Sequence, residues 1–395
     1  MPNLHFFPDL MLLCIGAAAQ GQIAWLLAKR PGNRGPTFRA RRLWPATAAS
    51  LGLLAVGYLL GFRRVALHFP VWWSTWMQGA SLIWDVIVVG SALAATGWWS
   101  LDRLSRWKRS GESRLEDAGR RGFLRAAGGA LFAAPLAVAG FGIVNRNRFQ
   151  LTQTDIPIAG LPDELDGLRI AQITDIHLSA FLSEREFARA VDMANETLPH
   201  LALVTGDLIT RHGDPLDACL RQLARLKAGF GVLGCLGNHE IYTGTEAYVT
   251  EAGRRIGIEF LRMSSREIRF GNASINFAGV DYQRTGRRYL VGAETLVVPG
   301  KLNVMLSHNP DVFPVAARQG YNLTIAGHTH GGQVNVEILN DNINLARFYT
   351  PFTRGLYRQE NAAIFVSSGI GTVGMPLRLG APAEVNLIRL RRAEG

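Results

Sequence analysis

Five short polar blocks follow apolar runs in the C-terminal two-thirds of the chain, and they constrain the fold more than any other feature. The blocks are Asp175-Ile176-His177, Gly206-Asp207, Gly237-Asn238-His239-Glu240, His308 and Gly327-His328-Thr329-His330. The preceding runs LRIAQIT, LALVT, FGVLGCL, KLNVMLS and YNLTIA have the apolar character of buried strands. Strand ends that meet at one edge of a sheet would gather these Asp, His and Asn side chains. A pair of divalent cations needs such mixed nitrogen and oxygen donors.

The pattern around these blocks predicts an α/β fold. Strands are expected at residues 168–174, 201–205 and 231–236, with helices around 183–197 and 215–227. This alternation predicts a sheet covered by helices. From about Glu259 the sequence becomes rich in strand patterns, which predicts a second sheet facing the first.

The blocks differ in how specific they are. Gly-Asp after a strand is often only a turn or a helix cap, and Asp-x-His occurs in many loops. The block from Gly327 to His330, followed by Gly-Gly-Gln, is more specific, because paired histidines on a glycine-rich loop are not a core pattern. His200 and His212 are expected at the surface rather than among the ligands.

Together the blocks resemble those of the calcineurin-like metallophosphoesterase superfamily, in particular its membrane-anchored or twin-arginine-exported bacterial branch. The similarity covers roughly residues 168–390 and includes the tail SSGIGTVGMPLRLGAPAEVNLIRL. This resemblance implies an αββα sandwich of two mixed sheets with two divalent metal ions at one edge. Donors of this kind accept Mn, Fe or Zn, and the sequence does not select among them.

The resemblance also implies a role for each matching residue. Seven would be metal ligands: Asp175, His177 and His330 for one ion, Asn238, His308 and His328 for the other, and Asp207 between both. The ions would share a hydroxide that attacks phosphorus in line, while His239 protonates the leaving group as general acid. Glu240 would orient the neighbouring residues.

Further phosphate contacts are expected from two arginines and one backbone segment. Arg354 and Arg378 have the side chain that best matches phosphate geometry. The amides around Gly369–Gly371 are the third candidate.

The N-terminal third predicts an all-α transmembrane region over residues 1–149, before a catalytic domain over residues 150–395. Apolar segments near 9–28, 45–62, 79–99 and 126–144 approach the length of about 20 residues that spans a bilayer. Residues 29–42 and 101–125 hold six and eight basic residues, but residues 63–78 hold two. By the positive-inside rule, this pattern places the catalytic domain on the periplasmic side of a bacterial inner membrane.

Other features of the N-terminal third leave alternatives open. Arg120-Arg121-Gly122-Phe123-Leu124-Arg125 resembles a twin-arginine signal, which would make the export machinery a partner. An ordinary basic helix end is the alternative. Asp85, Gln20 and Gln22 are polar residues in apolar segments, and they are the only support for a transport role. Anchoring is the simpler role for these helices.

The charge distribution and the cysteine spacing bear on two further properties, namely nucleic-acid binding and disulfide formation. Residues 1–149 contain 18 of the 42 basic and 6 of the 31 acidic residues, a balance of +12, which leaves −1 for the remainder. A nucleic-acid partner is therefore not expected, since a basic footprint should lie on the catalytic domain. Cys219 and Cys235 lack CxxC spacing, and a disulfide between them stays open.

The sequence thus predicts a membrane-tethered phosphoesterase acting on phosphodiesters or phosphomonoesters outside the cytoplasm. Proximity to the bilayer makes a lipid-linked phosphate a candidate substrate. One alternative is a hydrolase of nucleoside-diphosphate-linked acylated sugars in lipid A type metabolism, which would favour a cytoplasmic site. Another is a non-enzymatic metal-binding scaffold, against which the complete ligand set argues.

Overall fold

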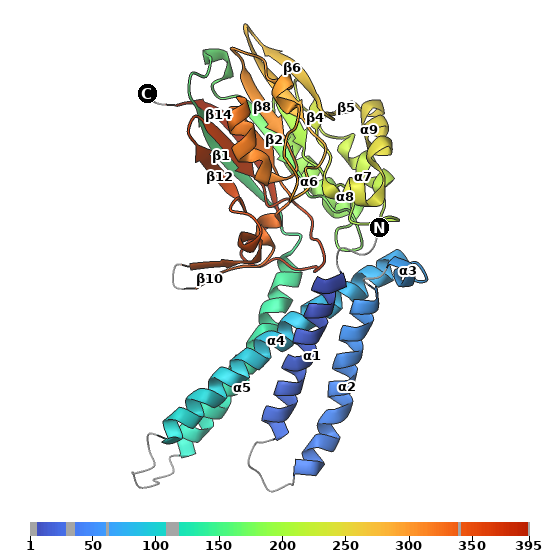
Figure 1. Cartoon of the computed structure of the whole chain (residues 1–395), viewed down its shortest axis with the longest axis vertical. Coiled ribbons are helices and arrows are strands. Elements are labelled where there is room, and N and C mark those ends of the chain that lie inside the picture. The colour runs from blue at the N-terminus through green and yellow to red at the C-terminus, as the bar shows by residue number, and fades with distance from the viewer. Residues whose placement is uncertain (1–5, 29–35, 61–62, 108–117, 339–340, 394–395) are drawn as a thin grey trace. The chain divides into compact units, whose positions relative to one another are not determined.

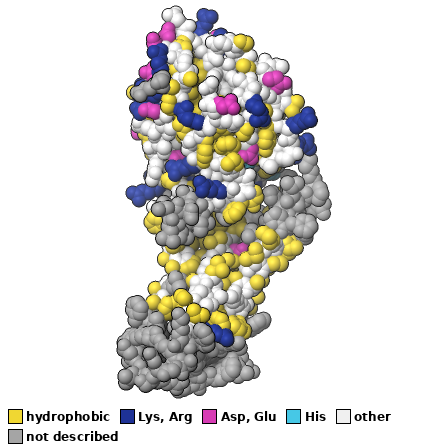
Figure 2. Space-filling model, turned by 60° about the vertical axis from the view of Figure 1, so that its left-hand side comes forward, with side chains coloured by type: hydrophobic (Ala, Val, Ile, Leu, Met, Phe, Trp, Pro, Cys, Tyr) yellow, Lys and Arg dark blue, Asp and Glu magenta, His cyan; other side chains and the backbone are white. Residues whose placement is uncertain are grey.

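The structure is a computed structural model that describes residues 6–28, 36–60, 63–107, 118–338 and 341–393 (Figure 1). The chain divides into two compact units, Met1–Val144 and Asn145–Gly395. In Figure 2 hydrophobic side chains are prominent on the described part of the first unit, whereas Lys and Arg are interspersed with Asp and Glu on the second.

The first unit is helical. Its helices are α1 (Phe6–Ala28), α2 (Pro36–Leu60), α3 (Arg63–Ala66), α4 (Val71–Trp107) and α5 (Ala118–Asn145). Among the described residues, two helical stretches are long and apolar enough to cross a membrane: Val71–Leu101 and Ala126–Asn145. The apolar stretches Leu13–Leu26 and Pro45–Leu60 are shorter. The described parts of all four expected apolar segments therefore lie in helices, and among the described residues two of these stretches have the length of a full span.

The basic connections expected between these segments are partly helical. Helix α2 begins at Pro36, α4 continues to Trp107, and α5 begins at Ala118, so that Arg120 and Arg121 lie in its first turn. Residues 29–35 and 108–117 of the expected connections lie outside the described residues. The helix boundaries thus differ from those expected from hydropathy alone.

Polar side chains join the helices of this unit. Ser50 donates a hydrogen bond to the Gln20 amide oxygen (2.5 Å), and Gln22 donates one to Thr96 (2.7 Å). Both glutamines therefore act in helix packing, which weakens the case for a transport role. Asp85 is buried, and its Oδ1 atom has no hydrogen-bond partner within the described part of the chain.

The second unit contains two mixed six-stranded sheets. The first has the order β1 (Gln150–Ile158), β14 (Glu384–Arg392), β2 (Arg169–Ile173), β3 (Leu201–Val204), β4 (Val232–Gly234), β5 (Ile258–Phe260). The second has the order β12 (Gly355–Gln359), β13 (Ala362–Val366), β9 (Leu323–Ala326), β8 (Leu302–Leu306), β7 (Ala273–Gly279), β6 (Ser264–Phe270). Strands β2 to β5 run parallel, as do β13, β9, β8 and β7. Strands β10 (Asn335–Ile338) and β11 (Asp341–Asn344) form a separate antiparallel pair.

Helices cover the outer faces of both sheets. They are α6 (Glu184–Glu196), α7 (Leu216–Leu223), α8 (Asn238–Thr243), α9 (Glu246–Arg255) and α10 (Phe313–Gln319). Short 3-10 helices are Asp163–Leu165, Ala293–Leu296, Pro310–Val312, His330–Gly332 and Leu345–Phe348. Helix α6 begins at a capping box, in which Ser183 and Glu186 satisfy each other's backbone amides.

Apolar side chains fill three layers of this unit. Ile170 and Leu203 of the first sheet meet Phe277 and Val304 of the second in one buried cluster between the sheets. A second cluster joins the first sheet to α6 and α7, and further clusters join the second sheet to α10. Burial of both faces of each sheet explains the continuous apolar runs in the sequence. The expected αββα sandwich is confirmed (Figure 1).

Several sequence-based assignments within this sandwich were wrong. Strands β5 and β14 belong to the first sheet, although the strand-rich region after Glu259 was assigned to the second. Strand β5 continues the parallel series after β4, and β14 inserts between β1 and β2. Strands β1 and β12 were not anticipated, and α7 ends at Leu223, earlier than expected.

Candidate metal centre

The five polar blocks lie at the carboxyl ends of β2, β3, β4, β8 and β9. Because β2, β3 and β4 run parallel, their ends lie at one edge of the first sheet. Strands β8 and β9 likewise end together in the second sheet. Loops that leave parallel strands at the same edge are where α/β proteins usually place functional groups. The structure thus brings together side chains that are up to 155 positions apart in the sequence, from Asp175 to His330.

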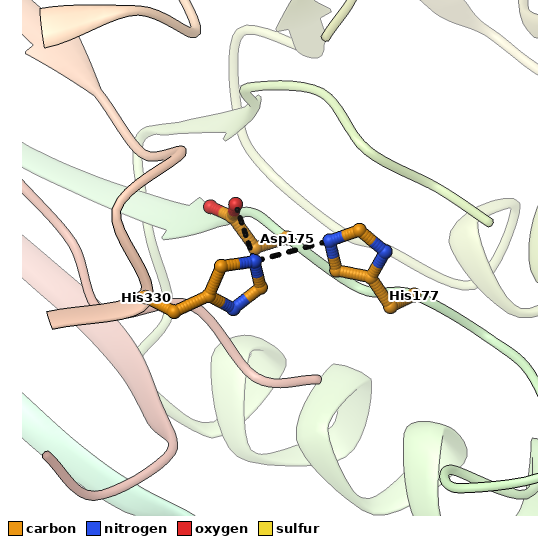
Figure 3. A group of neighbouring side chains, drawn as sticks. All are labelled: Asp175, His177 and His330. Carbon is orange, nitrogen blue, oxygen red and sulfur yellow. Dashed lines mark hydrogen bonds and ion pairs between the residues drawn. The ribbon is translucent and has the colours of Figure 1, made fainter. Parts of the chain in front are cut away.

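One cluster of donors consists of Asp175, His177 and His330 (Figure 3). The Nε2 atom of His330 lies 3.2 Å from Nε2 of His177 and 3.4 Å from Oδ1 of Asp175. All three side chains are buried. Two ring nitrogens that face each other beside a carboxylate can both direct lone pairs at one cation.

A second cluster consists of Asp207, His308 and His328. The Nε2 atom of His308 lies 3.0 Å from Oδ2 of Asp207, and its Nδ1 atom lies 2.6 Å from the Thr205 carbonyl oxygen. The carbonyl can only accept, so Nδ1 carries the proton and Nε2 faces the carboxylate. His328 packs against His308 with ring centroids 5.1 Å apart.

Asp207 and His177 connect the two clusters. Oδ2 of Asp207 also lies 3.5 Å from Nε2 of His177, and the donor atoms of Asp207, His177 and His239 form a third cluster. Oδ1 of Asp207 accepts a hydrogen bond from the His239 amide (2.9 Å). The position of Asp207 between the clusters is the one expected for a bridging carboxylate.

Asn238 completes the predicted set. Its side chain is buried, and its Oδ1 atom has no hydrogen-bond partner among the residues that the structure describes. A buried acceptor without a donor is costly, and a cation would satisfy it. This orphaned oxygen and the nitrogen and oxygen donors around it fit divalent transition metals.

Burial keeps most of the histidines neutral. It lowers the pKa of His177 and His330 below the ordinary value, and burial with the neighbouring His308 lowers the pKa of His328 to about 3. Neutral imidazoles have the lone pairs that a metal ligand needs. Burial opposes the charged form of His308, but the Asp207 and Asp175 carboxylates raise its pKa to about 10.

The carboxylates of Asp175 and Asp207 differ in the direction in which their pKa values are shifted. Burial raises the pKa of Asp175 to about 6, although the His308 ring opposes this rise. Burial would also raise the pKa of Asp207, but the His308 and His239 rings hold it well below the ordinary value. The site thus contains a carboxylate that stays ionised while surrounded by imidazoles.

The backbone at the centre is strained. Five of the predicted ligands have positive φ angles: Asp175 (50°), His177 (46°), Asp207 (57°), His328 (76°) and His330 (52°). Each such conformation of a non-glycine residue costs about 1–3 kcal/mol and is retained where function requires it. Because the loops turn sharply at these residues, donor side chains that are close in sequence contribute to the same group of metal-binding atoms.

Two glycines allow the loops to approach each other. A Cβ atom at Gly237 would overlap Oδ1 of Asp207, and one at Gly327 would overlap Oδ2 of Asp175. The glycines in the blocks Gly-Asn-His-Glu and Gly-His-Thr-His are thus required by packing against the carboxylates.

Glu240 holds these loops, as the sequence predicts. Its buried carboxylate accepts hydrogen bonds from the amides of Asp207 (2.9 Å), Leu208 (2.8 Å) and Gly237 (2.8 Å). The carboxylate therefore ties the loop after β3 to the loop after β4. Within the described part of the chain, its hydrogen-bond partners are backbone amides and not the predicted metal-binding atoms.

We expect Glu240→Gln to weaken metal binding about 10- to 100-fold, because an amide nitrogen would face backbone N–H groups that now donate to oxygen. Metal titration and thermal denaturation would measure the loss. Glu251→Gln is the matched control, since Glu251 pairs only with Arg254 and Arg255 at the surface. Equal metal affinity in Glu240→Gln and the wild type would contradict the orienting role.

Thr210 was not anticipated from the sequence. Its carbonyl oxygen lies 2.6 Å from Nδ1 of His239, and its hydroxyl lies 3.1 Å from Nδ1 of His177. The turn is held by Asp214, whose carboxylate accepts from the Thr210 and Arg211 amides. Because the contact to His239 uses a backbone carbonyl, no residue type in the sequence could have indicated it.

The predicted phosphate contacts are partly wrong. Arg378 is buried, and its guanidinium donates to backbone carbonyls, including those of Ser368 (2.8 Å) and Ala381 (3.0 Å). This arginine supports the loop instead of facing a substrate. Arg354 pairs with Glu384 at 2.7 Å. The amides of Ile370 and Gly371 donate to the Thr174 and Asp175 carbonyls, so they are also engaged.

The remaining candidates lie away from the centre. The Nδ1 atom of His200 accepts a hydrogen bond from the Arg169 amide (3.0 Å), and His212 is exposed. His212 thus lies at the surface as expected, whereas His200 is half-buried. Cys219 and Cys235 are free and buried, so the disulfide left open by the sequence does not form in this structure.

Comparisons with known proteins match this chain to phosphoesterases. The sequence profile of the family described as "Calcineurin-like phosphoesterase" matches residues 168–332. The chain is 29% identical over 308 residues to "Transmembrane protein with metallophosphoesterase domain" of Danio rerio, covering 74% of this chain and 69% of the relative. It is 28% identical over 287 residues to "Uncharacterized metallophosphoesterase YkuE" of Bacillus subtilis, covering 70% and 99%. An "Uncharacterized metallophosphoesterase" of Aquifex aeolicus is 30% identical over 234 residues, covering 57% and 85%.

Proposed function

As a member of the calcineurin-like phosphoesterase family, this chain is a metal-dependent phosphoester hydrolase, and we propose that it is tethered to a membrane and cleaves phosphodiesters or phosphomonoesters at a two-metal centre. The observation that carries this proposal is the convergence of three overlapping donor clusters on one edge of the sandwich. Asp207 belongs to two of the three clusters, as a shared ligand would.

The proposed ligand sets follow the clusters. Asp175, His177 and His330 would hold one cation, and His308, His328 and the orphaned oxygen of Asn238 would hold the other. Asp207 would contact both. The donors suit Mn²⁺, Fe or Zn²⁺. When bound, such ions lower the pKa of a water molecule and neutralise charge on phosphoryl oxygens.

His239 is placed to exchange a proton with the leaving group. Its Nδ1 atom lies 2.6 Å from the Thr210 carbonyl oxygen, which can only accept, so Nδ1 carries a proton. The other ring nitrogen, Nε2, is therefore the one that faces the departing oxygen, and it donates a proton to that oxygen when the ring is an imidazolium with protons on both nitrogens. The His239 amide bonded to Asp207 keeps the ring beside the metal ligands.

Membrane attachment is supported by the first unit and by one relative. Two stretches have the length and hydropathy of membrane spans, and apolar side chains such as Leu93, Phe141 and Val144 are exposed. The Danio rerio relative is named as a transmembrane protein. The basic residues at 29–42 and 101–125 favour a periplasmic catalytic domain on a bacterial inner membrane. The Arg120-Arg121 motif favours the twin-arginine export machinery as a partner, and the membrane setting favours a lipid-linked substrate.

Metal removal tests the proposed chemistry. We expect the full chain in detergent to lose hydrolysis of bis(p-nitrophenyl) phosphate and p-nitrophenyl phosphate after chelation, and to regain it with Mn²⁺, Fe²⁺ or Zn²⁺. The ester that is cleaved faster would distinguish a diesterase from a monoesterase. Restoration by Mg²⁺ alone would contradict the nitrogen-rich ligand set, and activity that survives chelation would contradict a metal centre.

A further inference from the structure

A basic loop lies beside the metal centre. Residues 282–290, called here the arginine loop, follow β7 and carry Arg284, Arg287 and Arg288, all exposed. At the start of this loop, the Tyr282 ring packs 5.3 Å from the His328 ring, and its hydroxyl lies 3.5 Å from Nε2 of His328. One end of the arginine loop therefore touches a predicted metal ligand.

The base of the loop is firmly held. The Gln283 side chain accepts from the Leu290 amide (3.0 Å) and donates to the Asp281 carbonyl (2.9 Å), which ties the two ends of the loop together. Asn309, the neighbour of His308, donates to the Gln283 carbonyl (2.7 Å). The loop is thus anchored to the metal-site loop after β8, while its arginines stand at the surface.

The arginines of the loop have no carboxylate partner among the residues that the structure describes. Other surface arginines are paired, for example Arg221 with Glu184 and Arg389 with Asp155. By contrast, no ion pair to the three loop arginines occurs within the described ranges. Residues 150–395 have a balance of −1, so this positive charge is local to the loop rather than general.

One arginine of the loop, Arg284, acts electrostatically on Tyr242, a side chain beside His239. Burial and Asp207 raise the pKa of the Tyr242 hydroxyl, and the Arg284 guanidinium opposes this rise. Arg284 is therefore within electrostatic range of Tyr242, whose ring stands 5.5 Å from the His239 ring. Together with the contact of Tyr282 with His328, this places the start of the arginine loop beside the metal centre.

An open hollow of about 540 Å³ continues from the loop. Its lining includes the basic Arg287 and Arg288, the acidic Glu294, the polar Gln319 and the apolar side chains of Leu290, Val291 and Val315. Its volume lies within the range of small-molecule sites. The Glu294 carboxylate accepts a hydrogen bond from the Gln319 amide (3.1 Å), so the anion would be received by the arginines rather than by the whole lining.

We infer that the arginine loop binds a second phosphate group of the substrate, next to the phosphoryl group that reacts. This inference rests on the proposed function. Cations in the centre would already neutralise the reacting phosphoryl group, so the additional arginines serve a second anion, for which their planar donors are well suited. The substrate class is a diphosphate-linked ester. Water adds to one phosphorus, the bond to the bridging oxygen breaks, and the departing phosphate takes the proton.

The diphosphate could belong to a soluble molecule or to a lipid, and separate probes can distinguish these two kinds of substrate. The soluble probe is uridine diphosphate glucose, and the lipid probe is a polyprenyl diphosphate in detergent micelles. The one-phosphate reference is the p-nitrophenyl ester of uridine 5′-monophosphate. The enzyme is the full metal-loaded chain, and its triple variant carries Arg284→Gln, Arg287→Gln and Arg288→Gln. Arg269→Gln, at an exposed position on β6, is the matched control.

We expect the triple variant to lose about 100-fold in kcat/KM on whichever diphosphate probe the wild type cleaves, mainly through KM. On the one-phosphate reference the loss should stay below about threefold. Arg269→Gln should match the wild type on both. Because the substituted side chains are exposed, the thermal midpoint of the triple variant should equal that of the wild type.

Three results would overturn the inference. Equal losses on the reference and on the diphosphate probe would show that the loop does not recognise a second phosphate. A wild type that cleaves the reference but neither diphosphate probe would remove the substrate class and leave the proposed function standing. A triple variant that keeps its diphosphate activity but no longer binds anionic-lipid vesicles would reassign the loop to the membrane surface. Inactivity of the metal-loaded wild type on all three compounds would instead defeat the proposed function itself, and the inference with it.

Discussion

Asp207→Ala is expected to lower kcat/KM for a phosphodiester by at least about a thousandfold and to reduce the amount of bound metal. Asp207 is the carboxylate whose oxygens lie near His308 (3.0 Å) and His177 (3.5 Å), one from each donor cluster. Its loss would remove the shared anion and leave buried imidazoles facing one another. Elemental analysis of the purified protein and steady-state kinetics would measure both effects.

Asp192→Ala is the control for this experiment. Asp192 pairs with Arg225 on the surface, where an ion pair contributes little to stability. It should bind metal and cleave substrate like the wild type. If Asp207→Ala retained full metal content together with full activity, the assignment of the centre would be wrong.

His239→Ala is expected to have an effect that depends on the leaving group. For an alkyl phosphodiester, whose departing oxygen needs a proton, turnover should fall by about a hundredfold or more. For a p-nitrophenyl ester, which leaves readily as an anion, the loss should be less than about tenfold. Metal content should stay close to that of the wild type, because His239 is not among the proposed ligands.

His212→Ala provides the comparison, since His212 is exposed and lies close to Thr210 in the sequence. The slope of log kcat against leaving-group pKa should be steeper in His239→Ala than in either His212→Ala or the wild type. Parallel slopes in all three proteins would exclude proton donation by His239.

Much of the centre could be predicted because its residues follow strands directly. Alternating strands and helices placed Asp175, Asp207 and Asn238 at neighbouring strand ends, and the structure brings them to one edge. Their roles as ligands remain predictions. The αββα sandwich itself came from a resemblance carried by the same blocks.

Other parts of the site could not be predicted for physical reasons. Sequence does not indicate whether an arginine is buried, so Arg378 was taken for a phosphate contact although its guanidinium binds backbone carbonyls. Thr210 acts on His239 through its carbonyl oxygen, which every residue type possesses. The arginine loop was not predicted. Arg284 becomes a candidate substrate contact only because the structure places Tyr282, two residues before it, beside His328.

The assignment of strands to sheets failed where pairing is distant in sequence. Strand β1 pairs with β14, so that Gln150 lies opposite Glu384. Local patterns contain no information on such a partner. The strand-rich region was therefore assigned to a single sheet, although its last strand belongs to the other.

The position of β14 has a consequence for how the enzyme is made. This strand lies between β1 and β2, and the segment just before it packs against the first metal-site loop, where the Gly371 amide donates to the Asp175 carbonyl (2.8 Å). During translation, β1 and β2 emerge long before the strand that joins them. A nascent chain, or one cut short before Glu384, would therefore lack both a closed first sheet and a supported Asp175 loop. Hydrolytic activity is therefore expected only once synthesis has passed β14.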